Sequence, residues 1–370
     1  MSKSRNRAPV ERFQFPGVQK HWYDQSLTMA MGCQGCVHSG ICGGLQIEAA
    51  VFDCLTYCRC TDPTTCDNVC QRNAGHMIAR LHEVKGLELD NVPSASPTPS
   101  PVLPLAAPLI YHNGSRVGRL DAGTVVLSLY EMFKGGAIRF SSRQQLLDHF
   151  NLTENTTIIL SGTQEDFLIE RWWGLTHREA VTRGLVDMGV AMVTTPNYSL
   201  FGDVPRLDNL FNMKRIALVW SEIQTEGMPC ALHVNARTPK DFVRWTTFLL
   251  EHPEITHIAY EFGTGAGSIT RIGWHVGQLV ALARQVPRSL HLIVRGGINE
   301  LPTLTPAFGG VTFIDTTSFL KTTKRQRLRL TESGISSDLT PTAKGQPLDE
   351  LLAANIATMR EHVRRSAGAQ

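Results

Sequence analysis

The sequence contains no apolar run that approaches about 20 residues, the length that an α-helix needs to cross a bilayer. Its mixed, polar N-terminal region also lacks the continuous apolar stretch of a secretory signal peptide. Charge of one sign is not in excess, because 36 Lys and Arg stand against 33 Asp and Glu, giving a net charge of +3. These absences argue against a membrane span, a globally basic nucleic-acid coat protein and an acidic disordered tail. We therefore expect a cytoplasmic protein without membrane contact.

Cysteine is almost absent outside one short segment. Eight of the nine cysteines lie in the N-terminal part, and the ninth, Cys230, stands alone. Disulfides need an oxidising compartment, and no export signal supports one. The spacing therefore predicts a metal-binding module with these ligands: Cys33, Cys36, Cys42, Cys54, Cys58, Cys60, Cys66 and Cys70.

The spacing leaves the identity of the metal open. Zinc takes four ligands per ion, so eight cysteines could hold two ions, although only Cys33 and Cys36 have the C-x2-C spacing of a zinc knuckle. The C-x-C-x5-C-x3-C half, from Cys58 to Cys70, resembles zinc clusters with bridging sulfurs found beside some chromatin-modifying domains. The glycine-rich surroundings of Cys42 would also suit an iron–sulfur cluster. We expect zinc, with an iron–sulfur cluster as the alternative, in either a structural or a redox role.

Proline marks the boundary of this module. The segment 93–108 reads PSASPTPSPVLPLAAP and holds six of the 19 prolines. Because proline lacks an N–H, such a segment is expected to be an extended, exposed spacer. We predict a cysteine-rich metal-binding module at 1–92, a proline-rich linker at 93–108, a (β/α) barrel domain at 109–330, and a polar segment with a C-terminal helix at 331–370.

The domain at 109–330 alternates short apolar runs with amphipathic stretches of helical length, a pattern typical of parallel strands joined by crossover helices. Seven strands are expected, with an eighth near 109–120, which together fit a TIM-like (β/α) barrel. An open doubly wound sheet is the alternative, although no GxGxxG follows the first strand. The seven strands are expected at Val125–Leu129, Thr157–Leu160, Val190–Val193, Ala231–Val234, His257–Tyr260, Leu290–Val294 and Val311–Ile314.

Polar residues follow most of these strands, at the end where barrel enzymes carry their chemistry. Glu261 and Asp315 could act as a general base or nucleophile, and Arg295 and Asn235 complete the predicted catalytic set. Arginine could clamp an anion, and glycine would let backbone N–H groups approach a phosphate. The predicted ligand-binding residues are Gly263, Gly265, Gly296, Gly297, Arg237 and Asn197.

The segment Pro196-Asn-Tyr-Ser-Leu-Phe201 resembles a motif of a poorly characterised bacterial and phage protein family. Asp166–Trp173 and Leu232–Asn235 fit the same resemblance, which covers about residues 120–265 and implies a barrel-like fold but no particular activity. The stretch from Gly296 through Asp315 is faintly similar to tRNA-guanine transglycosylase barrels. The chain departs from that family in lacking its Asp-Ser-Gly-Gly segment and its late C-x-C-x2-C zinc motif.

One basic run follows the last strand, and clustered Lys and Arg are the usual footprint of phosphate contact. We expect a metal-binding barrel enzyme that acts on a phosphate-bearing substrate, such as a nucleotide or nucleic-acid base, by hydrolysis or transfer. The alternatives are a regulatory module that binds nucleic acid or a partner protein, and an iron–sulfur redox protein. Nucleic acid would contact Lys321, Lys324, Arg325, Arg327 and Arg329.

Overall fold

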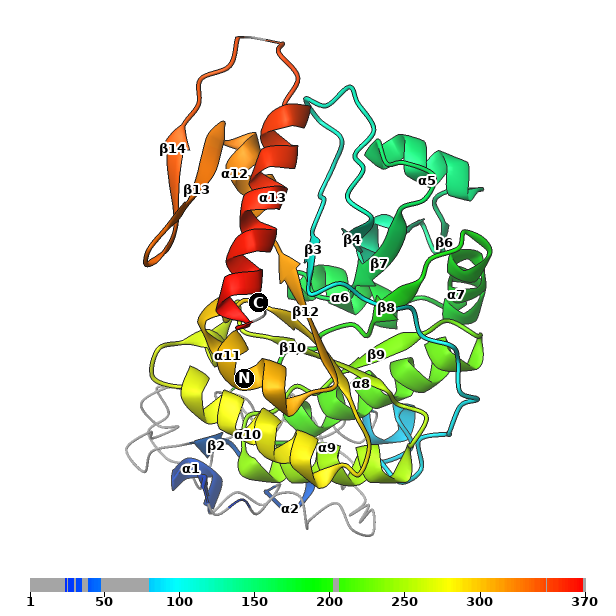
Figure 1. The fold of residues 1–370 in the computed structure, drawn as a ribbon. Coiled ribbons are helices and arrows are strands. Elements are labelled where there is room, and N and C mark those ends of the chain that lie inside the picture. Colours follow the sequence, from blue (N-terminus) through cyan, green and yellow to red (C-terminus); the bar gives the residue numbers. More distant parts are fainter. Residues whose placement is uncertain are drawn as a thin grey trace, which may run out of the picture. The chain divides into compact units, whose positions relative to one another are not determined.

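The structure is a computed structural model that describes residues 24, 26–29, 31–34, 39–47, 80–201, 206–343 and 345–368 (Figure 1). Its contacts divide the chain into two compact units. The first unit contains residues up to Asn91 together with 199–218 and 236–244. The second, called the barrel unit below, contains 92–198, 219–235 and 245 onward.

The barrel unit is built on one sheet of eight parallel strands, in the order β3-β12-β11-β10-β9-β8-β7-β4. The two end strands meet through a parallel bridge between Leu109 and Val126, so the sheet is a nearly closed barrel. This confirms the predicted α/β class and is consistent with a TIM-like barrel rather than an open sheet. The strands are β3 (Ala106–Pro108), β4 (Thr124–Ser128), β7 (Thr157–Ser161), β8 (Met192–Thr194), β9 (Cys230–His233), β10 (His257–Glu261), β11 (His291–Arg295) and β12 (Gly310–Asp315).

Helices separate most of the strands, as expected for crossover connections. Between β3 and β4 the described residues form no helix, and the chain passes through a loop at 109–123. The hairpin β5 (Phe133–Lys134) and β6 (Ala137–Ile138) follows β4. The helices are α5 (Arg143–Phe150), α6 (Asp166–Trp173), α7 (Arg178–Asp187), α8 (Arg206–Thr225), α9 (Pro239–Glu251), α10 (Ile272–Gln285), α11 (Leu301–Leu304), α12 (Thr317–Thr323) and α13 (Asp349–Ser366).

The interior of the barrel is filled by small and branched side chains, because alternate residues of each strand point to its axis. Each of the eight strands supplies one member of a single buried cluster, and Leu109, which directly follows β3, supplies a ninth. The cluster consists of Ala107, Leu109, Val126, Ile159, Met192, Ala231, Ala259, Ile293 and Ile314.

The predicted eighth strand lies earlier than expected. β3 occupies Ala106–Pro108, inside the segment assigned to the linker, and all three of its residues are buried. The preceding proline-rich residues also form hydrogen bonds within the barrel unit. The Ser221 hydroxyl donates to the carbonyl oxygen of Pro93 at 2.7 Å, and the Thr312 hydroxyl donates to that of Pro104 at 2.8 Å. This part of the segment is therefore packed, although it has no helix or strand before β3.

After the barrel strands, the chain forms an antiparallel hairpin of β13 (Gln326–Thr331) and β14 (Gly334–Leu339), which lies beside α13 (Figure 1). The sequence analysis assigned this region to a basic run and a polar stretch and missed the hairpin. The side chain of Asn355, which is fully buried on α13, connects this helix to α12 and β13. Its Nδ2 donates to the Thr322 hydroxyl and the carbonyl oxygen of Gln326, and its Oδ1 accepts from the backbone N–H of Leu328.

In the first unit, β1 (Thr28–Met29) pairs with β2 (Gln46–Ile47), and the short helices α1 (Met31–Gln34) and α2 (Ser39–Cys42) lie between them in the chain. The helices in the described ranges include none with the length and apolar content needed to cross a bilayer.

Candidate functional site

Two predicted site residues meet at the carboxyl ends of adjacent barrel strands. Glu261 and Arg295 are register partners, the last residues of β10 and β11, and Arg295 Nε lies 3.5 Å from Glu261 Oε2. The Glu261 side chain is 3% exposed and that of Arg295 is 27% exposed. A distance of 3.5 Å is longer than the usual 2.7–2.9 Å or so of a strong charge-assisted hydrogen bond. The two charges are close enough to attract each other, but among the described residues they do not form a strong hydrogen bond with each other.

Burial is the main influence on Glu261. It raises the pKa of this carboxyl above its ordinary value, although the charge of Arg295 and a hydrogen bond from the Gly263 N–H oppose the rise. That N–H reaches Oε1, whereas buried Oε2 accepts no hydrogen bond from the described residues. Burying a carboxylate oxygen is energetically unfavourable unless a hydrogen-bond donor or a cation contacts it. Glu261 therefore has the environment of a group that binds or exchanges a proton.

Tyr111 belongs to the same group of charges. It follows β3, is half-buried and packs against the barrel core. Burial raises the pKa of its hydroxyl; Arg295 lowers that pKa, and Glu261 and Asp315 raise it. The sequence analysis did not select Tyr111 because the strand before it was placed too late in the chain.

His233, the last residue of β9, is a second residue that the sequence analysis missed. Its side chain is buried, with Nδ1 lying 2.6 Å from the carbonyl oxygen of Thr195 and Nε2 lying 3.3 Å from the hydroxyl oxygen of Thr163. Burial, with a smaller contribution from the charge of Arg295, lowers the pKa of His233 to about 4. The sequence analysis chose residues that follow the predicted strands, whereas His233 lies inside the predicted strand Ala231–Val234.

Asn197 and Asn235 lie together, and their hydrogen bonds connect two loops to each other. Asn235 Nδ2 donates to Asn197 Oδ1 and, at 2.9 Å, to the carbonyl oxygen of Tyr198. The carbonyl oxygen of Asn235 accepts a hydrogen bond from Trp245 Nε1 at 2.6 Å. The two amides thus connect the segments that follow β8 and β9, and the predicted roles of Asn235 in catalysis and of Asn197 in ligand binding stay predictions.

Asp315 was predicted as a general base or nucleophile, and its described hydrogen bonds stabilise the start of a helix. Its Oδ1 accepts the backbone N–H groups of Thr317 at 2.8 Å and Ser318 at 3.0 Å, at the start of α12. Burial raises the pKa of this carboxyl, and those hydrogen bonds oppose the rise. Asp315 therefore caps the first turn of α12, and its catalytic role stays a prediction.

The predicted glycines have mainly structural reasons to be glycine. Gly296 and Gly297 have φ of 75° and 66°, the left-handed region that other residues avoid. A Cβ on Gly297 would also lie 2.9 Å from the ring of Phe262. Gly263 gives its N–H to Glu261, and Gly265 is exposed with open space where a Cβ would be. The Gly296–Gly297 turn therefore allows two loops at the strand ends to approach closely.

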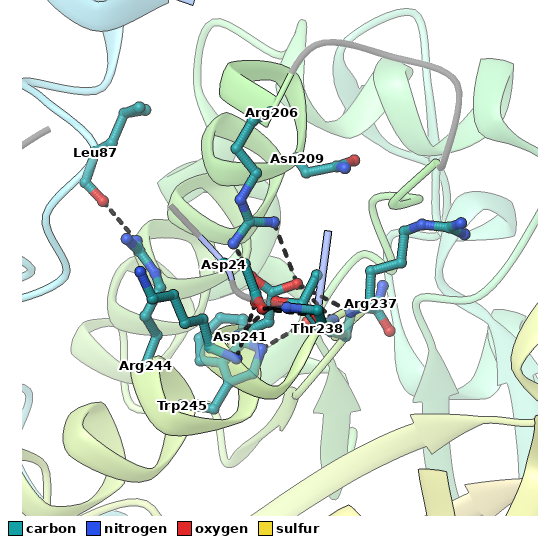
Figure 2. A network of polar contacts seen from close by, with 12 residues as sticks. Asp24, Leu87, Arg206, Asn209, Arg237, Thr238, Asp241, Arg244 and Trp245 are labelled. Atoms are coloured by element: carbon teal, nitrogen blue, oxygen red, sulfur yellow. Dashed lines mark hydrogen bonds and ion pairs between the residues drawn. The ribbon is translucent and has the colours of Figure 1, made fainter. Parts of the chain in front are cut away.

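Arg237 belongs to the first unit, where a buried network connects the starts of α8 and α9 (Figure 2). Arg206 and Asp241 form a two-pronged ion pair, with side-chain exposures of 1% and 0%. Asp241 also accepts the backbone N–H groups of Arg237 and Thr238, while the Thr238 hydroxyl accepts that of Asp241 at 3.3 Å. This reciprocal pair is a capping box. The Arg237 side chain extends away from Asp241 in Figure 2.

Two of the eight clustered cysteines lie among the described residues. Cys33 and Cys42 are both buried, 5% and 3% exposed. The Cys33 sulfur accepts the backbone N–H of Leu45 at 3.4 Å, and the Cys42 sulfur accepts that of Gly44 at 3.3 Å. Hydrogen bonds from backbone N–H groups to sulfur are favourable for thiolate ligands. The other six, Cys36, Cys54, Cys58, Cys60, Cys66 and Cys70, lie outside the described residues.

The residues of the basic run lie on α12, in the turn after it and on β13, and several of them contact neighbouring side chains. Lys321 on α12 donates to the Ser337 hydroxyl at 3.0 Å, and Arg325 donates to the Thr342 hydroxyl at 2.7 Å. On β13, Arg329 pairs with Asp338 of β14 at 2.8 Å, while Arg327 and Lys324 are exposed. Nucleic-acid contact through these residues stays a prediction.

Comparison with known proteins assigns neither a family nor an activity to the chain. The chain matches no protein-family model, and a search of curated proteins finds no significant match. The resemblances drawn from its motifs therefore stay expectations, and functional conclusions depend on the geometry of the two units.

Proposed function

We propose that the chain is an enzyme whose site lies at the carboxyl ends of β10 and β11, and that it acts on a phosphate-bearing substrate by hydrolysis or transfer. The observation that carries the proposal is the loose, partly buried pair of Glu261 and Arg295. If this ion pair only stabilised the barrel, we would expect its nitrogen and oxygen atoms to lie within hydrogen-bond distance of each other.

In this proposal Arg295 binds the anionic group of the substrate. Its guanidinium is the partly exposed member of the pair, and its planar donors match phosphate oxygens. Glu261 exchanges the proton. Its burial raises its pKa toward the range in which a carboxyl can both accept and release a proton. An anion on Arg295 would weaken the attraction that keeps Glu261 ionised, so substrate binding would raise that pKa further.

The test is binding of inorganic phosphate and nucleoside monophosphates, measured by calorimetry and thermal shift. Arg295→Gln should weaken binding at least tenfold, because a charged hydrogen bond contributes about 1.5–3 kcal/mol. Glu261→Gln should retain phosphate binding and lose turnover of any substrate found. Arg329→Gln, which removes an exposed arginine of the same unit, is the matched control. Wild-type affinity in Arg295→Gln would contradict the proposal.

A second candidate function is metal binding by the N-terminal cysteines, favoured by the N–H···S contacts at Cys33 and Cys42. Gly44 provides one of these N–H groups with φ of 66°, and a Cβ there would lie 3.2 Å from Cys33 Cβ. The donor set fits zinc or an iron–sulfur cluster. Zinc would supply folding energy to the surrounding segment, whereas a cluster would also supply electron transfer.

Anaerobic purification followed by measurement of iron, zinc and acid-labile sulfide tests this candidate. Cys33→Ser and Cys42→Ser should each lower the bound metal. Cys230→Ser should not, because Cys230 is a buried thiol of β9 whose pKa is raised by burial. Metal-free wild-type protein, or equal loss in all three variants, would contradict the assignment of Cys33 and Cys42.

A further inference from the structure

The imidazole of His233 is fixed in one tautomer by its neighbours. The carbonyl oxygen of Thr195, 2.6 Å from Nδ1, can only accept a hydrogen bond, so Nδ1 carries the proton. The backbone N–H of His233 also donates to the Thr195 hydroxyl at 2.9 Å, which holds the end of β9 against the residue that follows β8. In the neutral ring Nε2 is therefore an acceptor.

This acceptor determines how the Thr163 hydroxyl is oriented. Nε2 lies 3.3 Å from Thr163 Oγ1, and a neutral Nε2 without a proton can only receive one. The Thr163 hydroxyl therefore donates its hydrogen to His233, and its oxygen keeps lone pairs for another donor. Thr163 is half-buried, so this oxygen is not sealed inside the barrel core.

Arg295 lies against the same residue. Its Nη1 is 3.5 Å from the carbonyl oxygen of Thr163, a weak contact that an incoming anion could replace. The charge of Arg295 also acts on His233 and helps to keep that ring neutral. The hydroxyl oxygen of Thr163 can therefore accept a hydrogen bond from a ligand, and the Arg295 guanidinium, which can donate to that ligand, lies beside the same residue.

We propose that the ligand of this site carries an anionic oxygen and, within a few bonds of it, a hydroxyl or amine that donates to Thr163 Oγ1. The anionic group would be held by Arg295, and the neighbouring donor would be selected by the pair of Thr163 and His233. This inference rests on the proposed function, because it adds a second recognition point to the same anion site. A phosphate ester of a polyol or sugar fits it better than a simple alkyl phosphate.

The test compares three probes on the full chain by calorimetry: inorganic phosphate, glycerol 3-phosphate, which has hydroxyls near its phosphate, and propyl phosphate, which has none. Glycerol 3-phosphate should bind the wild type about tenfold more tightly than propyl phosphate, the ratio expected for one hydrogen bond. Thr163→Val should bring that ratio close to one while phosphate affinity stays within a factor of about two. Thr163→Ser should restore the preference.

Thr153→Val is the matched control, because Thr153 precedes the same strand, β7, and its hydroxyl contacts that of Thr156. It should leave the ratio unchanged. Equal wild-type binding of the two esters, or a preference that persists in Thr163→Val, would overturn this inference and leave the anion site intact. Failure of all three probes to bind the wild type would overturn the anion site and the inference together.

Discussion

The buried ion pair of the first unit gives a prediction whose size can be derived from its contacts. Asp241→Ala removes an ion-pair partner of a guanidinium that is 1% exposed. Breaking a buried ion pair by removing one partner costs about 3–5 kcal/mol. It also removes the acceptor for the backbone N–H groups of Arg237 and Thr238, at 3.0 and 3.1 Å. Native proteins have about 5–15 kcal/mol of stability in total, so the expected loss is a large share.

Removing the arginine of this pair should lower the free energy of unfolding by less than removing the aspartate. In Arg206→Met the carboxylate of Asp241 keeps both backbone donors and its place in the first turn of α9, where the helix dipole favours a negative charge. We expect this variant to lose about 1–2 kcal/mol less than Asp241→Ala, the contribution of those retained hydrogen bonds. The double variant should show a coupling energy of about 2 kcal/mol, because the residues contact each other directly.

The assay is urea unfolding combined with hydrogen exchange, which reports the first turns of α8 and α9 separately from the rest of the chain. Glu361→Gln, which removes exposed ion pairs with Arg364 and Arg365 on α13, is the control and should change the free energy of unfolding far less than Asp241→Ala does. A loss below about 1 kcal/mol in Asp241→Ala, or equal losses in the two single variants, would refute the reasoning from burial and retained hydrogen bonds.

Three further predictions concern the barrel unit. His257 and His291 stack with ring centroids 4.9 Å apart, and burial lowers the pKa of each to about 4, below the unfolded value near 6.5, so acid favours the unfolded chain. Their contribution to stability should be full above about pH 6.5 and fall toward pH 4; a urea midpoint unchanged between pH 7.5 and 4.5 would contradict this. Asn355→Ala should cost about 3 kcal/mol, since it removes three buried hydrogen bonds, and should increase hydrogen exchange in β13; unchanged protection there would argue against the joining role. Asp315→Ala should lower the free energy of unfolding by about 1–2 kcal/mol as a lost cap and leave phosphate affinity unchanged, whereas loss of binding without loss of stability would support its predicted catalytic role.

The strands of the barrel could be predicted because they are buried on both faces and therefore stand out as apolar runs between amphipathic helices. β3 was placed too late because Ala106–Pro108 is short and ends in proline, which has no N–H to give to a sheet. The hairpin of β13 and β14 was missed for a different reason. Its exposed face carries arginines, so the alternation of Arg327, Leu328 and Arg329 looked like a charge run.

The candidate site could be predicted only in part. Glu261 and Arg295 were found because each ends an apolar run with a charge, and their strands are neighbours. Two predicted partners, Asn235 and Asn197, lie at the same end of the barrel but hydrogen-bond to each other. Arg237 could not be separated from the site by sequence, because it follows a barrel strand in the chain and yet belongs to the first unit.

Glu261 and Asp315 occupy equivalent places in the sequence, and the alternation of side chains explains why their roles differ. Glu261 stands two residues after Ala259, which faces the barrel core, so its carboxylate points to the axis and meets Arg295. Asp315 stands one residue after Ile314, which also faces the core, so its carboxylate points outward to α12. A charge at the end of a barrel strand is therefore placed to meet the other inward-facing side chains when it lies an even number of positions after a core-facing residue.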